Sequence, residues 1–164
     1  MRMASLRDLY QQQLLSLRQT EMSYLEVLPT LQSTASSYSL ARLLHDQIAR
    51  AQEHVRRLDT ILAPSRERES PKVAELMQVC RELSKHAEAI DDVRDAALIA
   101  AVQRFRHEQI AGYGCARAWA RVLGDDDGRI VLEKCLIDEK SCDAELTRLA
   151  EGANVRAAAA LVAA

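Results

Sequence analysis

Residues 99–123, IAAVQRFRHEQIAGYGCARAWARVL, decide the fold because apolar residues recur in them at spacings of three and four. This spacing places the apolar residues on one face of a long helix, and such a face is normally buried. Arg106 and Gln109 interrupt it near its centre, and a buried charge is costly unless it is paired and hydrogen-bonded. We therefore expect a polar site at this level of the interior. The face consists of Ile99, Val102, Arg106, Gln109, Tyr113, Ala116, Ala120 and Leu123.

The composition is typical of one all-helical domain. The chain has 164 residues, of which 48% are hydrophobic and 28% charged, with only five glycines and three prolines. A formal net charge of -2 and the lack of a basic stripe with interleaved aromatic residues argue against nucleic-acid binding. No signal peptide and no apolar run long enough to cross a bilayer are evident. We therefore expect a cytoplasmic protein that does not enter a membrane, and its four cysteines, which form no C-x-x-C pattern, should be reduced thiols.

Four long helices and one short helix are predicted from the periodicity and the end signals. Pro29 should kink or end the first, and Gly124 and Gly152 should end the last two long helices. The order predicts an all-α, ferritin-like antiparallel four-helix bundle over residues 1–151, with the short helix in the crossover connection. Residues 152–164 form an Ala-rich C-terminal tail, which we expect to be a partly ordered helix. The predicted helices cover about residues 5–28, 40–62, 71–89, 93–123 and 129–150.

Acidic residues interrupt the apolar faces of the first and last long helices. Glu21 lies on the face of Leu17 and Tyr24, and Glu139 recurs at the same helical spacing between two cysteines. Asp143 follows Glu139 by one turn and should lie on nearly the same face. The second helix has an apolar seam that includes Leu44, Ile48, Ala51, Val55, Leu58 and Leu62, with Gln47, Arg50 and His54 at its flanks.

These inward acids raise the question of a metal centre. Dinuclear iron or manganese bundles use carboxylates from all four core helices together with Glu-x-x-His pairs. The acids here are few, and the middle helices offer Arg50, His54, Arg106, His107 and Gln109 instead. If iron or manganese is bound, the candidate ligands are Glu21, Glu139, Asp143, His54 and His107. An isolated histidine or acid on a helix is nevertheless more often a hydrogen-bonded structural group.

The most distinctive stretch of the sequence is VRDAALIAAVQ at residues 93–103, which continues to His107, Ile110 and the Tyr113-Gly114 pair. Other distinctive residues are LRDLY at residues 6–10, Glu21, Leu28-Pro29, Val55, Arg57, Leu58, Asp138-Glu139-Lys140 and Asp143. At these residues the sequence resembles the YciE/YciF family of bacterial ferritin-like stress proteins, and the resemblance extends to about Glu151. It implies a ferritin-like bundle that is usually dimeric and that carries a dinuclear metal centre.

The sequence departs from that family pattern at the implied metal ligands. The resemblance places Gln47 and Arg50 where the family has histidine and glutamate, and Arg106 and Gln109 where it has two glutamates. These replacements remove three negative charges and add two positive ones, so two divalent cations at this site would be repelled. Of the family's site residues, only Glu21, His107, Glu139 and Asp143 carry over.

We therefore expect that no metal or other cofactor is bound and that a buried network replaces the metal centre. The predicted network contains Glu21, Arg50, Arg106, Gln109, Glu139 and Asp143, with the guanidinium groups in place of the metals. The expected function is non-catalytic: a structural or interaction role, as a homodimer, with an unknown protein partner and a connection to stress. One alternative is a ferritin-like oxidoreductase that binds iron or manganese. A second is a module that binds an anion or another small molecule through the two arginines.

Overall fold

The computed structural model of the protein describes residues 4–63, 73–85 and 91–160. These residues form five α-helices and no strand. The all-α prediction is therefore confirmed. The helices are α1 (Leu6–Thr34), α2 (Tyr38–Asp59), α3 (Ala74–Lys85), α4 (Asp91–Leu123) and α5 (Asp126–Ala160).

The helix ends follow from local capping. The Ser5 and Ser37 side chains accept hydrogen bonds from the backbone N–H groups of Asp8 and Leu40 at the starts of α1 and α2. Helix α4 ends before Gly124, which has φ 69°, a left-handed conformation that glycine adopts without strain. Because the connections at residues 35–37 and 124–125 are so short, α1 and α2 form one antiparallel hairpin and α4 and α5 form another.

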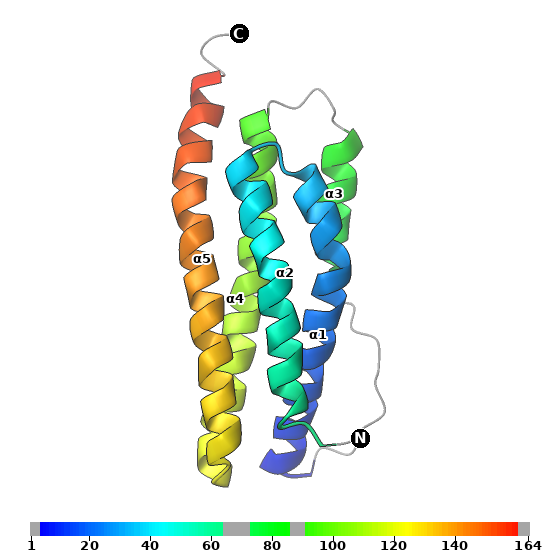
Figure 1. Cartoon of the computed structure of the whole chain (residues 1–164), viewed down its shortest axis with the longest axis vertical. Coiled ribbons are helices and arrows are strands. Elements are labelled where there is room, and N and C mark those ends of the chain that lie inside the picture. Colours follow the sequence, from blue (N-terminus) through cyan, green and yellow to red (C-terminus); the bar gives the residue numbers. More distant parts are fainter. Residues whose placement is uncertain (1–3, 64–72, 86–90, 161–164) are drawn as a thin grey trace.

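The two hairpins pack together as the predicted bundle with one crossover. Figure 1 shows the four long helices side by side, with α3 beside the upper half of α1. Helix α3 belongs to the connection from α2 to α4, and it packs against α1 and α4. The start predicted for this helix at Ser70 and Pro71, and its predicted end at Ala89, lie outside the described residues. Among the described residues, no helix is both long and apolar enough to span a membrane.

Four predicted helix boundaries are wrong. Helix α2 ends at Asp59 rather than at about residue 62. Helix α1 continues through Pro29 to Thr34, because buried Leu28 and Leu31 keep both sides of the proline packed in the core. Helix α5 starts at Asp126, where the Asp125 side chain accepts from the Gly128 N–H and caps residues that the sequence assigned to a turn. Gly152 does not end α5, which continues to Ala160. Buried Ala153 and the ion pair between Arg156 and Asp92 hold the extension against the bundle.

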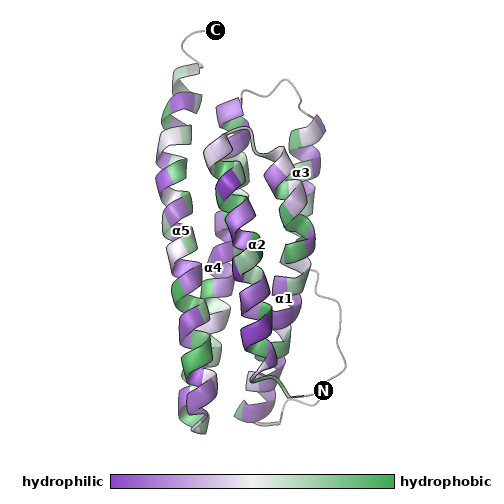
Figure 2. Ribbon diagram, viewed as in Figure 1, coloured by the Kyte–Doolittle hydropathy of each residue, from purple (hydrophilic) through white to green (hydrophobic). Residues whose placement is uncertain are grey.

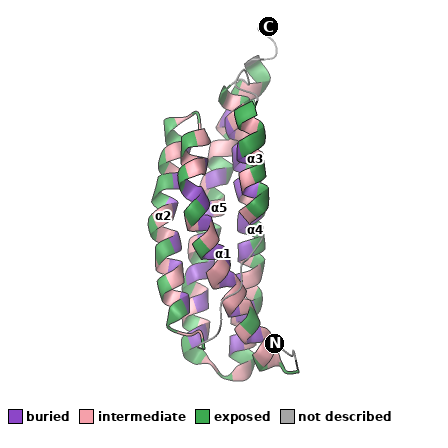
Figure 3. Ribbon diagram, turned by 90° about the vertical axis from the view of Figure 1, so that its right-hand side faces the viewer, coloured by how far each residue is buried: buried purple, intermediate pink, exposed green. Residues whose placement is uncertain are grey.

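The core consists of two apolar clusters separated by a polar layer. One cluster includes Tyr24, Ala51, Phe105 and Leu146, and the other includes Leu17, Leu58, Tyr113 and Leu136. Each long helix therefore contributes to both clusters and changes from one to the other at the same level. Hydrophobic residues alternate with hydrophilic ones along these helices (Figure 2), and the buried positions face the interior of the bundle (Figure 3). The polar layer contains Glu21, Gln47, His54, Arg106, Gln109 and Glu139, all of them buried.

Candidate functional site

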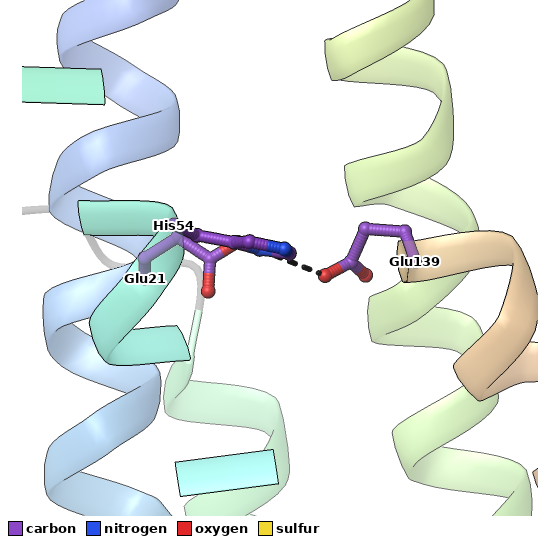
Figure 4. Close-up of side chains that lie close together, drawn as sticks. All are labelled: Glu21, His54 and Glu139. Atoms are coloured by element: carbon purple, nitrogen blue, oxygen red, sulfur yellow. Dashed lines mark hydrogen bonds and ion pairs between the residues drawn. The ribbon is translucent and has the colours of Figure 1, made fainter. Parts of the chain in front are cut away.

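His54 lies at the centre of the polar layer, between two carboxylates. Its Nδ1 atom is 3.0 Å from Oε1 of Glu21 and 3.4 Å from Oε1 of Glu139. Figure 4 shows the imidazole of α2 between Glu21 of α1 and Glu139 of α5. Burial lowers the pKa of His54, but the hydrogen bond and charge of Glu21 outweigh burial, so the pKa is raised above its ordinary value. The imidazole is therefore held toward its charged form.

Arg106 supplies the fixed positive charge of the site. Its Nη1 atom donates to both carboxylate oxygens of Glu139, at 2.6 and 2.8 Å, and its Nη2 atom donates to Oε1 of Gln47. The guanidinium carbon lies 4.5 Å from the centre of the Tyr24 ring, which is a cation–π arrangement. Burial raises the pKa of Glu139, while the charge of Arg106 opposes that shift. The arginine is held from three sides, and its charge faces an acid rather than water.

Two tyrosines also donate hydrogen bonds within the layer. The Tyr113 hydroxyl donates to Oε1 of Glu21 at 2.8 Å, and the Tyr24 hydroxyl donates to Oε1 of Gln47. The Tyr113 hydroxyl thus joins α4 to α1. Burial raises the pKa of both tyrosines, which keeps them protonated as donors. Oε2 of Glu21 and Oε1 of Gln109 are buried and make no hydrogen bond among the described residues.

The layer reaches solvent between α2 and α5. Nε2 of His54 lies 3.4 Å from Oδ2 of Asp138, and Nη1 of Arg57 donates to the same oxygen at 2.6 Å. The side chain of Asp138 is 37% exposed, so it connects the buried imidazole with the surface. The polar contacts therefore run without a break from Arg57 through His54 to Glu21 and Tyr113.

The structure separates the residues predicted for the buried network. Glu21, Arg106, Gln109 and Glu139 are buried in one layer, whereas Arg50 and Asp143 lie at its edge. The expectation for Arg50 is wrong: its side chain is 36% exposed and pairs with Glu145 at 3.2 Å, because Arg50 sits on the α2 flank that faces the rim of α5. Asp143 is only partly buried and lies 3.1 Å from Nε2 of His107, whose side chain is 65% exposed. Arg50 and Arg106 therefore form separate ion pairs.

Sequence reasoning missed part of the site on α2. It assigned Gln47 and His54 to the flanks of an apolar seam, but both are buried, and Ile48 and Val55 are only partly so. The real inward face is Leu40, Leu44, Gln47, Ala51, His54 and Leu58. These residues also follow a three-four spacing. The spacing of α2 is thus compatible with two inward faces, and the more apolar one is favoured when the helix is considered alone. The polar partners of Gln47 and His54 lie on other helices, so the sequence of α2 does not reveal them.

The layer offers few ligands for a dinuclear metal centre. Such a centre needs several carboxylates to neutralise two cations in a dry interior, yet Glu21 and Glu139 are the two carboxylates of this layer. Both oxygens of Glu139 already bind Arg106. Glu21, His54 and Glu139 do offer one ligand atom each, and these atoms all lie within 4.8 Å of one another. These three atoms could hold a single metal ion.

Comparison with known proteins gives consistent matches over nearly the whole chain. A family described as a domain of unknown function, DUF892, matches residues 5–160. Protein YciF of Escherichia coli K12 is 27% identical over 155 residues, which cover 92% of this chain and 93% of YciF. The crystal structure of the E. coli stress protein YciF matches with a TM-score of 0.83 at 26% identity, over 92% of this chain and 98% of that one.

A second solved structure gives a similar result. YcfI of Rhodopseudomonas palustris, described as a candidate structural protein, matches with a TM-score of 0.79 at 28% identity. The match covers 87% of this chain and 93% of that one. Together with the helix order, these likenesses confirm the predicted ferritin-like bundle.

Proposed function

The chain belongs to the YciE/YciF family, DUF892, and from that premise we propose that it is a member in which an arginine–carboxylate network replaces the dinuclear metal centre. Its role is structural or one of protein interaction, without catalysis. The observation that carries this proposal is the pairing of Arg106 with both oxygens of Glu139. A guanidinium keeps its proton at any relevant pH, so it is a permanent cation at this acid.

The balance of charge supports the proposal. Two buried carboxylates, Glu21 and Glu139, face the guanidinium of Arg106 and the imidazole of His54. With His54 protonated, two negative charges meet two positive ones, and the cluster is neutral without any metal. Adding two divalent cations would leave a large excess of positive charge in a buried site.

The network has a physical use in the fold. It joins α1 through Glu21, α2 through Gln47 and His54, α4 through Arg106, and α5 through Glu139. Sliding or rotating one helix against the others would leave a charge buried without a partner, which costs several kcal/mol. We infer that the network fixes the register of the four long helices. Packing of Leu and Ala side chains alone would distinguish less strongly between one register and another.

The names of two similar proteins suggest the cellular role. YciF is named a stress protein, and YcfI is described as a candidate structural protein. We propose a role of the same kind here, in the cytoplasm, where the four described cysteines stay free thiols. The proposed role does not involve nucleic acid, and the sequence does not identify a protein partner.

We further propose that the protein acts as a homodimer. Ile130 and Ile137 are 45% and 56% exposed, and their spacing of seven places them on one outer face of α5. We take this face as the contact surface of the proposed dimer. Sedimentation equilibrium of the full chain tests this part, with a dimer expected and a strict monomer contradicting it. The variant Ile137→Lys should weaken the dimer more than Tyr38→Lys, which changes an exposed side chain at the start of α2.

A second candidate function is a ferritin-like oxidoreductase that retains one iron or manganese ion. Its specific support is the triad of Glu21, His54 and Glu139, whose ligand atoms lie close enough to share an ion. The first proposal is favoured because Arg106 already occupies both oxygens of one of those three ligands.

Oxidation of iron(II) by oxygen separates the two candidates. The purified wild-type protein is mixed with iron(II) in air-saturated buffer, and the formation of iron(III) is followed by absorbance. We expect the same rate as in buffer alone, and the same rate with Glu21→Gln, which removes one carboxylate of the triad. A wild-type rate clearly above buffer that falls in Glu21→Gln would overturn the proposal and support the oxidoreductase.

A further inference from the structure

The three buried side chains of the triad are spaced like the ligands of one small cation. Nδ1 of His54 lies 3.0 and 3.4 Å from the nearest oxygens of Glu21 and Glu139. Around a tetrahedral zinc ion with bonds of 2.0–2.1 Å, neighbouring ligand atoms lie about 3.3 Å apart. Two of the three distances in the triad are therefore close to those of a zinc site.

The donor set is also suitable for a single divalent cation. One imidazole nitrogen and two carboxylates bind zinc, iron or manganese. Oε2 of Glu21 is buried and accepts no hydrogen bond among the described residues, so this carboxylate has coordination capacity to spare. With a neutral imidazole, the triad carries two negative charges, which a divalent cation would balance.

Arg106 is the obstacle to such an ion. Its Nη1 atom binds both oxygens of Glu139, and Gln47 and the Tyr24 ring keep the guanidinium from turning away. A cation at the triad would have to compete for Glu139 and would also meet the positive charge of Arg106 at short range. Both effects are strong in a buried site, where water does not screen them.

We propose that Arg106 is the specificity-determining residue that closes a single divalent-cation site formed by Glu21, His54 and Glu139. Replacing the arginine by a neutral residue opens this site to one Zn²⁺ ion. The inference rests on the proposed function, since it takes the wild-type network to be free of metal, and it adds that one side chain is responsible. It also assigns the three ligands of the site that the arginine closes.

The test is calorimetric titration of the variants Arg106→Met and Arg106→Gln with Zn²⁺. Breaking the buried pair leaves the Glu139 charge without its partner, so Zn²⁺ should bind the variants at least about 100-fold more tightly than the wild type, with one ion per chain. The melting temperature of each variant should rise as Zn²⁺ is added. Arg106→Gln is included in case Arg106→Met does not fold, because the glutamine amide can still donate a hydrogen bond to Glu139.

Two controls make the result specific to the triad. Arg104→Met changes an exposed arginine of the same helix that pairs with Glu75, and it should bind Zn²⁺ no better than the wild type. The double variant Arg106→Met with His54→Gln removes one ligand, and it should lose the tight binding while surface histidines and thiols stay unchanged.

The outcomes separate the two proposals. Tight binding of Zn²⁺ by the wild type, equal to that of the variants, overturns the proposed function and this inference together. A folded Arg106→Met or Arg106→Gln protein that binds no more tightly than the wild type overturns this inference alone. So do variants that stay unfolded in excess Zn²⁺, because the ion should restore the charge that the arginine supplied.

Discussion

The Arg106 guanidinium donates from Nη1 to both carboxylate oxygens of Glu139, at 2.6 and 2.8 Å, with both side chains at least 97% buried. Taking two charges out of water is costly, and a buried pair repays that cost only when its geometry is good and its remaining groups are bonded. Gln47, Tyr24 and His54 provide further contacts, while Nε of Arg106 is buried and makes no hydrogen bond among the described residues. The stability of the polar layer should therefore depend on the pair as a unit.

The first prediction concerns that unit. Arg106→Met alone, without added metal, should lower the free energy of unfolding by roughly 3–5 kcal/mol, because it leaves the charge of Glu139 buried and unpaired. The double variant Arg106→Met with Glu139→Leu should lose much less than the sum of the two single changes. Urea denaturation with unchanged m-values measures the cycle. Additive losses would show that the two charges do not act together.

The second prediction concerns the other arginine that the sequence placed in the network. Arg50 pairs with Glu145, and both side chains are about one third exposed. Because water screens such a pair, Arg50→Met should change the free energy of unfolding by no more than about 1 kcal/mol. Urea denaturation of Arg50→Met beside Arg106→Met provides the comparison. Equal losses in the two variants would contradict the separation of Arg50 from the buried layer.

The third prediction concerns pH. The pKa of His54 in the folded protein is raised above the ordinary 6.5. Between these two values the folded state binds more protons than the unfolded state, so the free energy of unfolding falls as pH rises. The contribution is complete below pH 6.5 and is lost as pH passes the folded pKa. The raised pKa of Glu139 acts in the same direction above its ordinary 4.5.

Urea denaturation from pH 6 upward measures this dependence. The slope due to one proton does not exceed about 1.4 kcal/mol per pH unit. His54→Gln should be less sensitive to pH than the wild type, because it removes the group whose pKa is raised. A wild type whose stability rises with pH over this range, or a variant with the same slope, would argue against a charged His54.

The fourth prediction concerns the tyrosine that bonds to Glu21. Tyr113→Phe removes a donor 2.8 Å from a buried carboxylate oxygen. The loss should be about 1.5–3 kcal/mol, as is usual for hydrogen bonds to charged groups. Tyr10→Phe is a matched control, since its hydroxyl donates to Asp125 in a part-buried position and its loss should be smaller. Thermal and urea denaturation compare the two variants. An equal loss of unfolding free energy in both would contradict a stronger hydrogen bond from Tyr113 to the buried Glu21.

The sequence was sufficient for the architecture because apolar spacing is a property of each helix by itself. Every residue of the face that begins at Ile99 is buried except Leu123, which is partly exposed. The same reasoning placed Glu21 and Glu139 inward, and they are buried. Boundaries were harder to predict, since packing carries α1 past Pro29 and α5 past Gly152.

The site could be predicted only in part, because its partners come from different helices. One helix alone does not show whether Gln47 or Ile48 faces inward; that depends on Tyr24 and Arg106, which both bond to Gln47. The position of Arg50 also depends on a partner from another helix, because its side chain donates to Glu145 of α5 and does not extend into the interior. Asp138 was not predicted as a site residue, because its contact with His54 depends on how α2 and α5 approach each other.

The central claim is that an arginine, and not a pair of metal ions, balances the buried acids. Elemental analysis tests it most directly, on full-length protein produced in medium supplied with iron and manganese and purified without chelator. The account predicts far less than one metal ion per chain for the wild type. One or two ions of iron or manganese per chain, lost in Glu21→Gln, would contradict it.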